Sequence, residues 1–218
     1  MISIITPAFN PGKYILDVHK CLQNQTYKNF EWLIIDDNSN EANKKIFKNL
    51  AETSPLNIRI FHNEANIMQS ASKNIGIQNA KGRYIKFIDA DDMIDNYHLE
   101  NQLKATLAAN SNQIIFSPTI NFYINDSGHL IKEVNNSYKL VDSNIESQLA
   151  LFMYKPFFHH CGCLYDKELI KNTFFFNEEL ITDEDGEFIL RLMLKGYTFI
   201  CEEKSNYLYR NHLGRRVS

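Results

Sequence analysis

Two carboxylates separated by one residue, Asp89 and Asp91, follow the largely apolar run of residues 84–88. If that run is a buried strand, both charges lie at its end, where like charges cost free energy unless a cation neutralises them. Hard oxygen ligands suit Mg²⁺ or Mn²⁺, which also accept water and phosphate oxygens as ligands. The motif therefore predicts a divalent-metal site, although a solvated acidic turn would have the same pattern.

A second acidic group, residues 183–185, begins an amphipathic segment that closes at Gly196. Acidic residues in a first helical turn are favoured by the helix dipole, so simple capping also accounts for them. A carboxylate in such a position acts as a general base if it lies within hydrogen-bond reach of a substrate hydroxyl. The group alone leaves both interpretations open.

Polar residues 36–39 follow another apolar run, and Phe9 follows the first apolar run of the chain. An aromatic ring beside the carboxylate of Asp37 could hold a nucleobase, with the carboxylate accepting an imide N–H, which favours uracil over cytosine. The alternatives are a core aromatic at Phe9 and a turn with a helix N-cap at residues 36–39.

The elements that position these residues alternate between short apolar runs and amphipathic segments, which is typical of β/α units feeding a mainly parallel sheet. We predict strands at 2–6, 31–35, 58–62, 84–88 and 114–117, and helices at 13–23, 41–53, 67–79 and 97–109. The alternation fades after residue 118, where we expect a strand pair over 121–131, turned at 125–128, and a helix over 143–154. Ligands bind beyond the carboxyl ends of parallel strands, which is where the polar groups lie.

Composition narrows the class of protein. The net charge is −3 and no basic block exceeds two adjacent residues, so nucleic-acid binding is not expected. No apolar run approaches the roughly 20 residues needed to span a bilayer, and the N-terminus has no signal-peptide pattern, which favours a cytoplasmic location. The four cysteines fit neither a disulfide framework nor a structural zinc site, so we expect reduced, packed thiols.

Several ordered motifs resemble family 2 glycosyltransferases with the GT-A fold. They are IITPAFN at 4–10, QTYKNFEWLIIDDNS at 25–39, SKNIGIQNAKGRYI at 72–85, the Asp89–Asp91 motif, and, further along, TDEDGEFILR at 182–191 and YRNH at 209–212. The resemblance implies an α/β fold of the GT-A type, a Rossmann-like, mainly parallel sheet flanked by helices, with a smaller acceptor-side region. It also implies a nucleotide-sugar-binding half at 1–117 and an acceptor-binding and catalytic-base half of the same domain at 118–218.

The resemblance further implies roles at the donor. Asp89 would face the ribose and sugar, Asp91 would hold Mn²⁺ or Mg²⁺ on the diphosphate, and His212 would reach the metal or the diphosphate, unless it is a surface histidine. Further donor contacts are implied at Pro7, Phe9, Asp37, Lys73, Gly162 and Arg210. Lys73 stands where the family often has arginine, and it keeps the charge without the planar fork. Arg210 and Arg215 are equally consistent with a solvated basic tail, and Gly162 with an ordinary turn glycine.

For the chemical step, the resemblance implies that Asp185 is the general base, with inversion at the anomeric carbon. Its neighbour Glu184 is expected to raise the proton affinity of Asp185. The adjacent pair His159-His160 is not expected to form a metal site, because neighbouring side chains project in different directions from most backbones.

The implied function is transfer of a hexose or N-acetylhexosamine from a UDP-sugar to a hydroxyl of a glycan or glycolipid acceptor in bacterial surface polysaccharide or oligosaccharide synthesis. Peripheral association with the inner membrane surface would accompany a lipid-linked acceptor. The alternatives are a catalytically silent nucleotide-sugar-binding domain and a haloacid-dehalogenase-like phosphatase, which would want its Asp-x-Asp on the first strand. A calcium-binding EF-hand fails, since Met93 and Ile94 stand where an oxygen ligand and a glycine are needed.

Overall fold

The computed structural model describes residues 1–125, 127, 129–133, 144–154, 156, 158–173 and 175–212. Parts of the predicted turn at 125–128, residue 143 of the predicted helix, and Arg215 lie outside the described residues.

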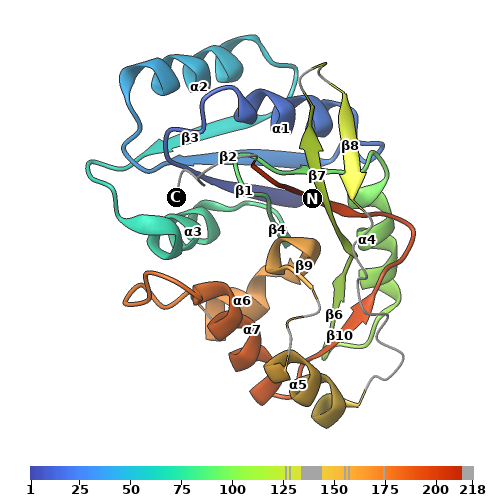
Figure 1. The fold of residues 1–218 in the computed structure, drawn as a ribbon. Helices are drawn as coiled ribbons and strands as arrows, with labels where there is room; N and C mark the ends of the chain where they lie inside the picture. The colour runs from blue at the N-terminus through green and yellow to red at the C-terminus, as the bar shows by residue number, and fades with distance from the viewer. Residues whose placement is uncertain are drawn as a thin grey trace.

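A seven-stranded sheet forms the centre of this part of the chain, in the order β10-β6-β9-β4-β1-β2-β3 (Figure 1). Its strands are β1 (Ile2–Ala8), β2 (Phe30–Asp36), β3 (Ile58–His62), β4 (Tyr84–Phe87), β6 (Gln113–Phe116), β9 (Cys163–Asp166) and β10 (Thr198–Cys201). β9 runs antiparallel to both β4 and β6, whereas the other pairs are parallel. The predicted α/β architecture with a mainly parallel sheet is confirmed.

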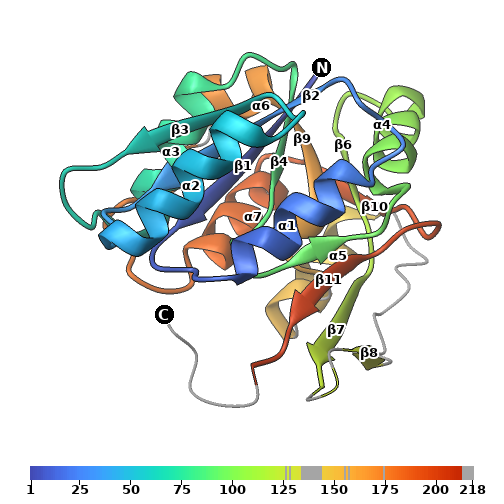
Figure 2. The ribbon, with the colours of Figure 1, turned by 90° about the horizontal axis from the view of Figure 1, so that it is seen from above.

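Helices lie on both faces of this sheet. They are α1 (Tyr14–Gln23), α2 (Glu41–Thr53), α3 (Met68–Asn79), α4 (His98–Ala108), α5 (Ile145–Tyr154), α6 (Lys167–Thr173) and α7 (Glu184–Leu194), with a 3₁₀ turn, η1, at His160–Gly162. α1 and α2 cover one face, and α3 and α7 lie on the other (Figures 1 and 2). Because strands covered on both faces have no solvent side, β2 is buried at every residue and is apolar except for Glu31 and the terminal Asp36.

A second, four-stranded sheet has the order β5-β11-β7-β8. It consists of β5 (Met93–Ile94), β7 (Thr119–Ile124), β8 (Leu130–Glu133) and β11 (Tyr207–Arg210). β11 pairs antiparallel with β5 and parallel with β7. This pairing brings residues 207–212 beside the segment that carries Asp91.

The strands and helices predicted in the first 117 residues are confirmed, with small differences at their ends. The sequence prediction missed β5, β9, β10 and β11, each of two to four residues. Such short strands are fixed by partners distant in sequence rather than by a local period. β9 and β10 come from residues after 117, so both proposed halves contribute strands to one central sheet.

None of the helices in the described part of the chain is long and apolar enough to cross a bilayer.

Candidate active site

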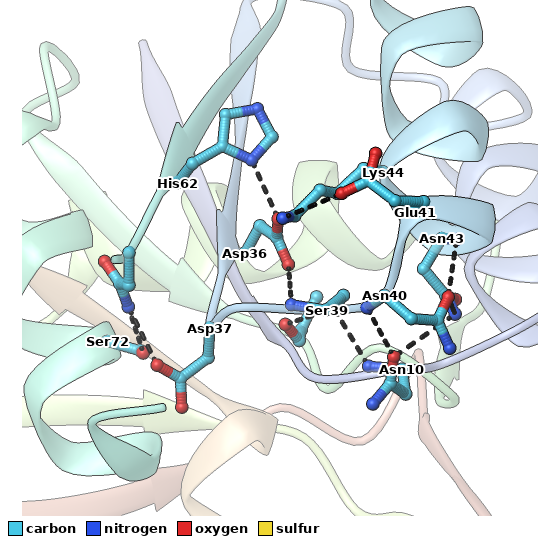
Figure 3. Close-up of polar contacts among 12 residues, drawn as sticks. Asn10, Asp36, Asp37, Ser39, Asn40, Glu41, Asn43, Lys44, His62 and Ser72 are labelled. Carbon is cyan, nitrogen blue, oxygen red and sulfur yellow. Dashed lines mark hydrogen bonds and ion pairs between the residues drawn. The ribbon is translucent and has the colours of Figure 1, made fainter. Parts of the chain in front are cut away.

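The carboxyl end of β2 carries Asp36 and Asp37, which point in different directions (Figure 3). Asp36 is fully buried, accepts a hydrogen bond from the Ser39 amide at 2.9 Å and contacts His62 Nδ1 at 2.7 Å. It therefore fixes the turn between β2 and α2. The helix N-cap itself is Asn40, whose side chain accepts from the Asn43 amide.

Asp37 is tied to the start of α3 instead. Its Oδ1 accepts from Ile67 N at 2.8 Å and from Asn63 Nδ2 at 2.9 Å, and its Oδ2 accepts from Met68 N at 2.9 Å. Asn63 Nδ2 also donates to Ser72 Oγ. Asp37 thus caps a helix 30 residues downstream, and its contact with uracil stays a prediction.

The loop after β1 lies beside these carboxylates. Asn10 adopts φ 48° and accepts a hydrogen bond from the Asn40 amide, so the loops that follow β1 and β2 are joined (Figure 3). Phe9 is 44% exposed, which excludes the core position considered for it. Pro7 is half-buried and is the penultimate residue of β1. An exposed aromatic at this edge is available for stacking, and that role stays a prediction for Phe9, as does donor contact for Pro7.

The Asp89–Asp91 motif follows β4 and meets the C-terminal segment. His212 Nε2 lies 2.7 Å from Asp91 Oδ2, and Arg210 Nε donates to the Asp91 carbonyl at 2.6 Å. Asp92 is buried and accepts from Tyr207 OH at 2.6 Å and Arg210 N at 2.8 Å. Burial, and then the charges of the two neighbouring motif carboxylates, raise the pKa of Asp92 well above its ordinary value. Asp92 therefore anchors β11 to the motif.

Arg210 was expected to reach the donor phosphates. Its Nη2 donates to Asp17 Oδ2 at 2.7 Å, and its guanidinium carbon lies 4.8 Å from the Tyr14 ring centroid and 4.6 Å from that of Phe122. The side chain is buried at 4% exposure. Arg210 thus joins α1 to the motif, and a phosphate contact stays a prediction.

Asp91 and His212 fit a hard divalent cation. Two ligand atoms bound to one ion at about 2.1 Å stand about 3 Å apart in octahedral geometry. The observed 2.7 Å between Asp91 Oδ2 and His212 Nε2 is close to that spacing. A carboxylate oxygen and an imidazole nitrogen are suitable donors for Mn²⁺, and two protein ligands leave positions for water and phosphate oxygens.

The second acidic group begins α7, where Asp183 takes φ 60° and the helix starts at Glu184. Asp185 Oδ1 lies 2.5 Å from Lys73 Nζ, and its Oδ2 lies 2.9 Å from His160 Nδ1. Lys73 also contacts Glu184 Oε1 at 3.2 Å. Three elements, α3, η1 and α7, therefore meet in one base cluster, by which we mean Lys73, His160, Glu184 and Asp185.

The electrostatics of the base cluster are dominated by its cationic and histidine members. Burial favours the protonated form of Asp185, but its interactions with His160 and Lys73 outweigh burial and hold its pKa far below the ordinary value. The rise in proton affinity expected from Glu184 stays a prediction. Burial lowers the pKa of His160 to about 4, so its ring is neutral at pH 7. Burial also opposes the charge of Lys73, but nearby acidic groups, Asp185 first, raise its pKa.

Lys73 is fully buried, so direct contact with a nucleotide would require its ammonium to leave the carboxylates of α7. The nucleotide contact stays a prediction, and the observed partners of the Lys73 ammonium are the carboxylates of Asp185 and Glu184.

Gly162 is required at its position for a structural reason. A Cβ there would meet the Ser117 carbonyl oxygen at 2.9 Å, so the turn needs glycine to pack against the end of β6. Its donor contact stays a prediction.

The side chains of His159, His160 and Cys161 lie closer together than expected, with one ligand atom of each within 4.8 Å of the others. The expectation that the two histidines project apart is wrong, since their ring centroids are 5.1 Å apart. His160 already contacts Asp185, however, and burial raises the pKa of the Cys161 thiol well above its ordinary value, which disfavours the thiolate that metals bind.

Sequence reasoning missed His160, Asp17 and Tyr207 as partners of the site. Their contacts span 25, 193 and 115 residues respectively, and no local pattern marks them.

Comparison with known proteins decides the family. The family model described as glycosyl transferase family 2 matches residues 3–174. The chain belongs to this family. Its fold is the GT-A type: S. aureus TarS 1–349, solved in complex with UDP-GlcNAc, superposes with a TM-score of 0.75 at 21% identity, over 98% of this chain and 59% of that chain.

Two curated relatives are similar in sequence to this family 2 chain over nearly its whole length. An uncharacterised glycosyltransferase of Methanocaldococcus jannaschii is 28% identical over 99% of this chain and 74% of its own length. The minor teichoic acid biosynthesis protein GgaB of Bacillus subtilis is 28% identical over 95% of this chain and 23% of its own length. The chain thus spans 74% of the length of the first relative and 23% of the length of the second.

Proposed function

We propose that this family 2 chain is an inverting hexosyltransferase that moves a hexose or N-acetylhexosamine from a UDP-sugar to a hydroxyl of a glycan or glycolipid. The observation that carries the proposal is the pair of acidic centres at the carboxyl edge of the sheet. In one centre the Asp91 side chain contacts His212, and in the other the Asp185 side chain contacts Lys73 and His160. One centre suits the departing diphosphate and the other suits the attacking hydroxyl.

The donor would lie along the edge that contains Phe9, Asp37, Asp89 and Asp91. Phe9 offers an exposed ring and Asp37 a carboxylate that is already oriented by three donors. TarS forms complexes with UDP and with UDP-GlcNAc, which supports a UDP-sugar as the donor class for this chain. Mn²⁺ or Mg²⁺ held by Asp91 and His212 would supply positive charge to the leaving diphosphate.

The base would act by proton transfer. Asp185 keeps 30% of its side chain exposed, and each of its carboxylate oxygens has a lone pair beyond the one used by Lys73 or His160. An acceptor hydroxyl that hydrogen-bonds there gives its proton to the carboxylate as its oxygen attacks the anomeric carbon opposite the diphosphate. Inversion at the anomeric carbon follows from this single displacement.

The biological setting is part of the same proposal. Similarity to a teichoic acid biosynthesis protein supports an acceptor in bacterial surface polysaccharide synthesis. We place the reaction in the cytoplasm, with peripheral contact to the inner membrane when the acceptor is lipid-linked.

The test is a panel of nucleotide sugars, screened for thermal stabilisation with and without Mn²⁺ and for donor hydrolysis. A ligand that binds only the native state raises the melting temperature as its concentration exceeds the dissociation constant. Stabilisation by UDP-sugars, with release of UDP, supports the proposal. Binding without any hydrolysis or transfer would favour the catalytically silent nucleotide-sugar-binding domain.

A further inference from the structure

His160 is a buried member of the base cluster. Its side chain is 1% exposed, whereas that of Asp185 is 30% exposed, and the two meet through a 2.9 Å contact between Nδ1 and Oδ2. A substrate can therefore reach Asp185 but not His160. Any role of His160 in the reaction has to act through the carboxylate.

The protonation of the pair follows from its partners. Burial lowers the pKa of His160 to about 4, so at neutral pH the ring carries one proton. An ionised carboxylate only accepts hydrogen bonds, which places that proton on Nδ1 and leaves Nε2 as an acceptor. Cys161 Sγ lies 3.3 Å from Nε2 and 3.6 Å from Nδ1, so it contacts both ring nitrogens, and its raised pKa keeps it a protonated thiol.

The surroundings hold the ring in this orientation. The ring centroid of His160 lies 5.7 Å from that of Phe87 and 5.9 Å from that of Phe176. Phe87 precedes His160 in the chain and Phe176 follows it, and both rings belong to the core. The same Cys161 sulfur lies 3.6 Å from Asp89 Oδ1. Contacts thus run from the donor carboxylate Asp89 through Cys161 and His160 to Asp185.

The two oxygens of Asp185 have partners of different kinds. Lys73 Nζ on Oδ1 is a charge on a flexible stem, whose three protons fix no direction. The imidazole Nδ1–H on Oδ2 is a single donor in the plane of a rigid ring. His160 and Lys73 together keep the carboxylate ionised, while the imidazole determines which way its free lone pairs point.

We propose that His160 is the positioning residue of the base: its Nδ1–H fixes the plane of the Asp185 carboxylate so that a free lone pair faces the acceptor hydroxyl. This inference rests on the proposed function, in which Asp185 takes that proton. Misplacement of a reacting group by about 1 Å can cost about 100-fold in rate, which sets the scale of the effect.

The test compares His160→Asn with His160→Gln. The amide nitrogen of asparagine occupies nearly the position of Nδ1, whereas that of glutamine occupies nearly the position of Nε2. We expect His160→Asn to keep kcat within a few-fold of wild type and His160→Gln to lower it by about 10- to 100-fold. UDP affinity measured by calorimetry should stay unchanged in both. His19→Gln, the same substitution on α1 away from the base cluster, is the matched control and should leave kcat at the wild-type value.

A double-mutant cycle separates positioning from general loss of structure. His160→Gln should have little further effect in an Asp185→Asn background, because the group that it positions is already inactive. Equal losses in His160→Asn and His160→Gln, or additive losses in the cycle, would overturn the inference. Near-normal turnover in Asp185→Asn would instead overturn the assignment of Asp185 as the base in the proposed function, so the two failures are distinguishable.

Discussion

The two acidic centres of this chain differ in how tightly their carboxylates are held. The side chain of Asp91 is 36% exposed, and within the described part of the chain its one side-chain partner is His212. Asp185 has a similar exposed fraction but two buried partners, one on each oxygen. A carboxylate that is to join a metal and a diphosphate must keep coordination positions open, whereas a base must present one lone pair in one direction. The difference in partners therefore matches the two roles that we propose for these carboxylates.

The largest expected effect is on turnover, from a substitution of the proposed base. Asp185→Asn keeps the size of the side chain and removes its proton affinity, so turnover should fall by about 100- to 10,000-fold. Donor affinity should change little, because Asp185 is proposed to contact the acceptor hydroxyl and not the nucleotide. Steady-state transfer alongside calorimetric titration of UDP measures both quantities. Glu184→Gln should cost less, since Glu184 contacts Lys73 at the longer distance of 3.2 Å. Near-normal turnover in Asp185→Asn would move the role of base to Glu184 or Asp183.

The second effect concerns the donor side. Asp91→Ala removes one of the two protein ligands in the predicted metal site, so Mn²⁺ should no longer strengthen UDP binding. Titrations of UDP with and without Mn²⁺ measure the difference, and UMP without metal is the control, which should bind equally to variant and wild type. If Mn²⁺ strengthens UDP binding to the variant as much as to wild type, Asp91 is not a metal ligand.

The pH dependence of stability sharpens the contrast between the centres. Burial lowers the folded-state pKa of His160 to about 4, from an ordinary value of 6.5. The unfolded chain therefore binds more protons between these values, and the free energy of unfolding should decrease as pH falls from 6.5 to 4, by about 2–3 kcal/mol from this residue. Denaturant unfolding at pH 7 and pH 4.5 measures the change. His160→Asn should show a smaller decrease, and an identical decrease would show that His160 does not titrate as a buried neutral ring.

The smallest effect concerns Asp37, a carboxylate held by neutral donors. Asp37→Ala leaves the Ile67 amide without its acceptor and the Met68 amide with only the Asn66 side chain, so the free energy of unfolding should fall by about 1–3 kcal/mol. UMP affinity should fall as well, whether or not metal is present. Asn40→Ala is the matched control, because it removes the cap of α2, at a cost of about 1 kcal/mol. We expect this control to leave UMP affinity unchanged. Unaltered UMP affinity in Asp37→Ala would reduce Asp37 to a helix cap.

Most of the fold of the first 117 residues was predictable, because its elements are encoded locally. Parallel strands buried on both faces form continuous apolar runs, and helices such as α2 carry their own caps, here Asn40. β9 and β11 were not predictable in the same way. Each is four residues long and owes its position to partners such as β4 and β7, which lie far away in the chain.

The sequence by itself determined which residues can do chemistry: the spacing of Asp89 and Asp91, the acidic start of α7, and the ordered motifs that indicate the family. Residue type and spacing suffice for this, because ligand chemistry and helix starts depend on a few adjacent side chains. Only the tertiary structure decided what each carboxylate contacts. Lys73 turned out to lie on Asp185, 112 residues away, and Arg210 on Asp17, 193 residues away. The charge state and orientation of a buried side chain depend on the residues packed against it. Those residues come from distant segments of the sequence, which only the folded chain brings together.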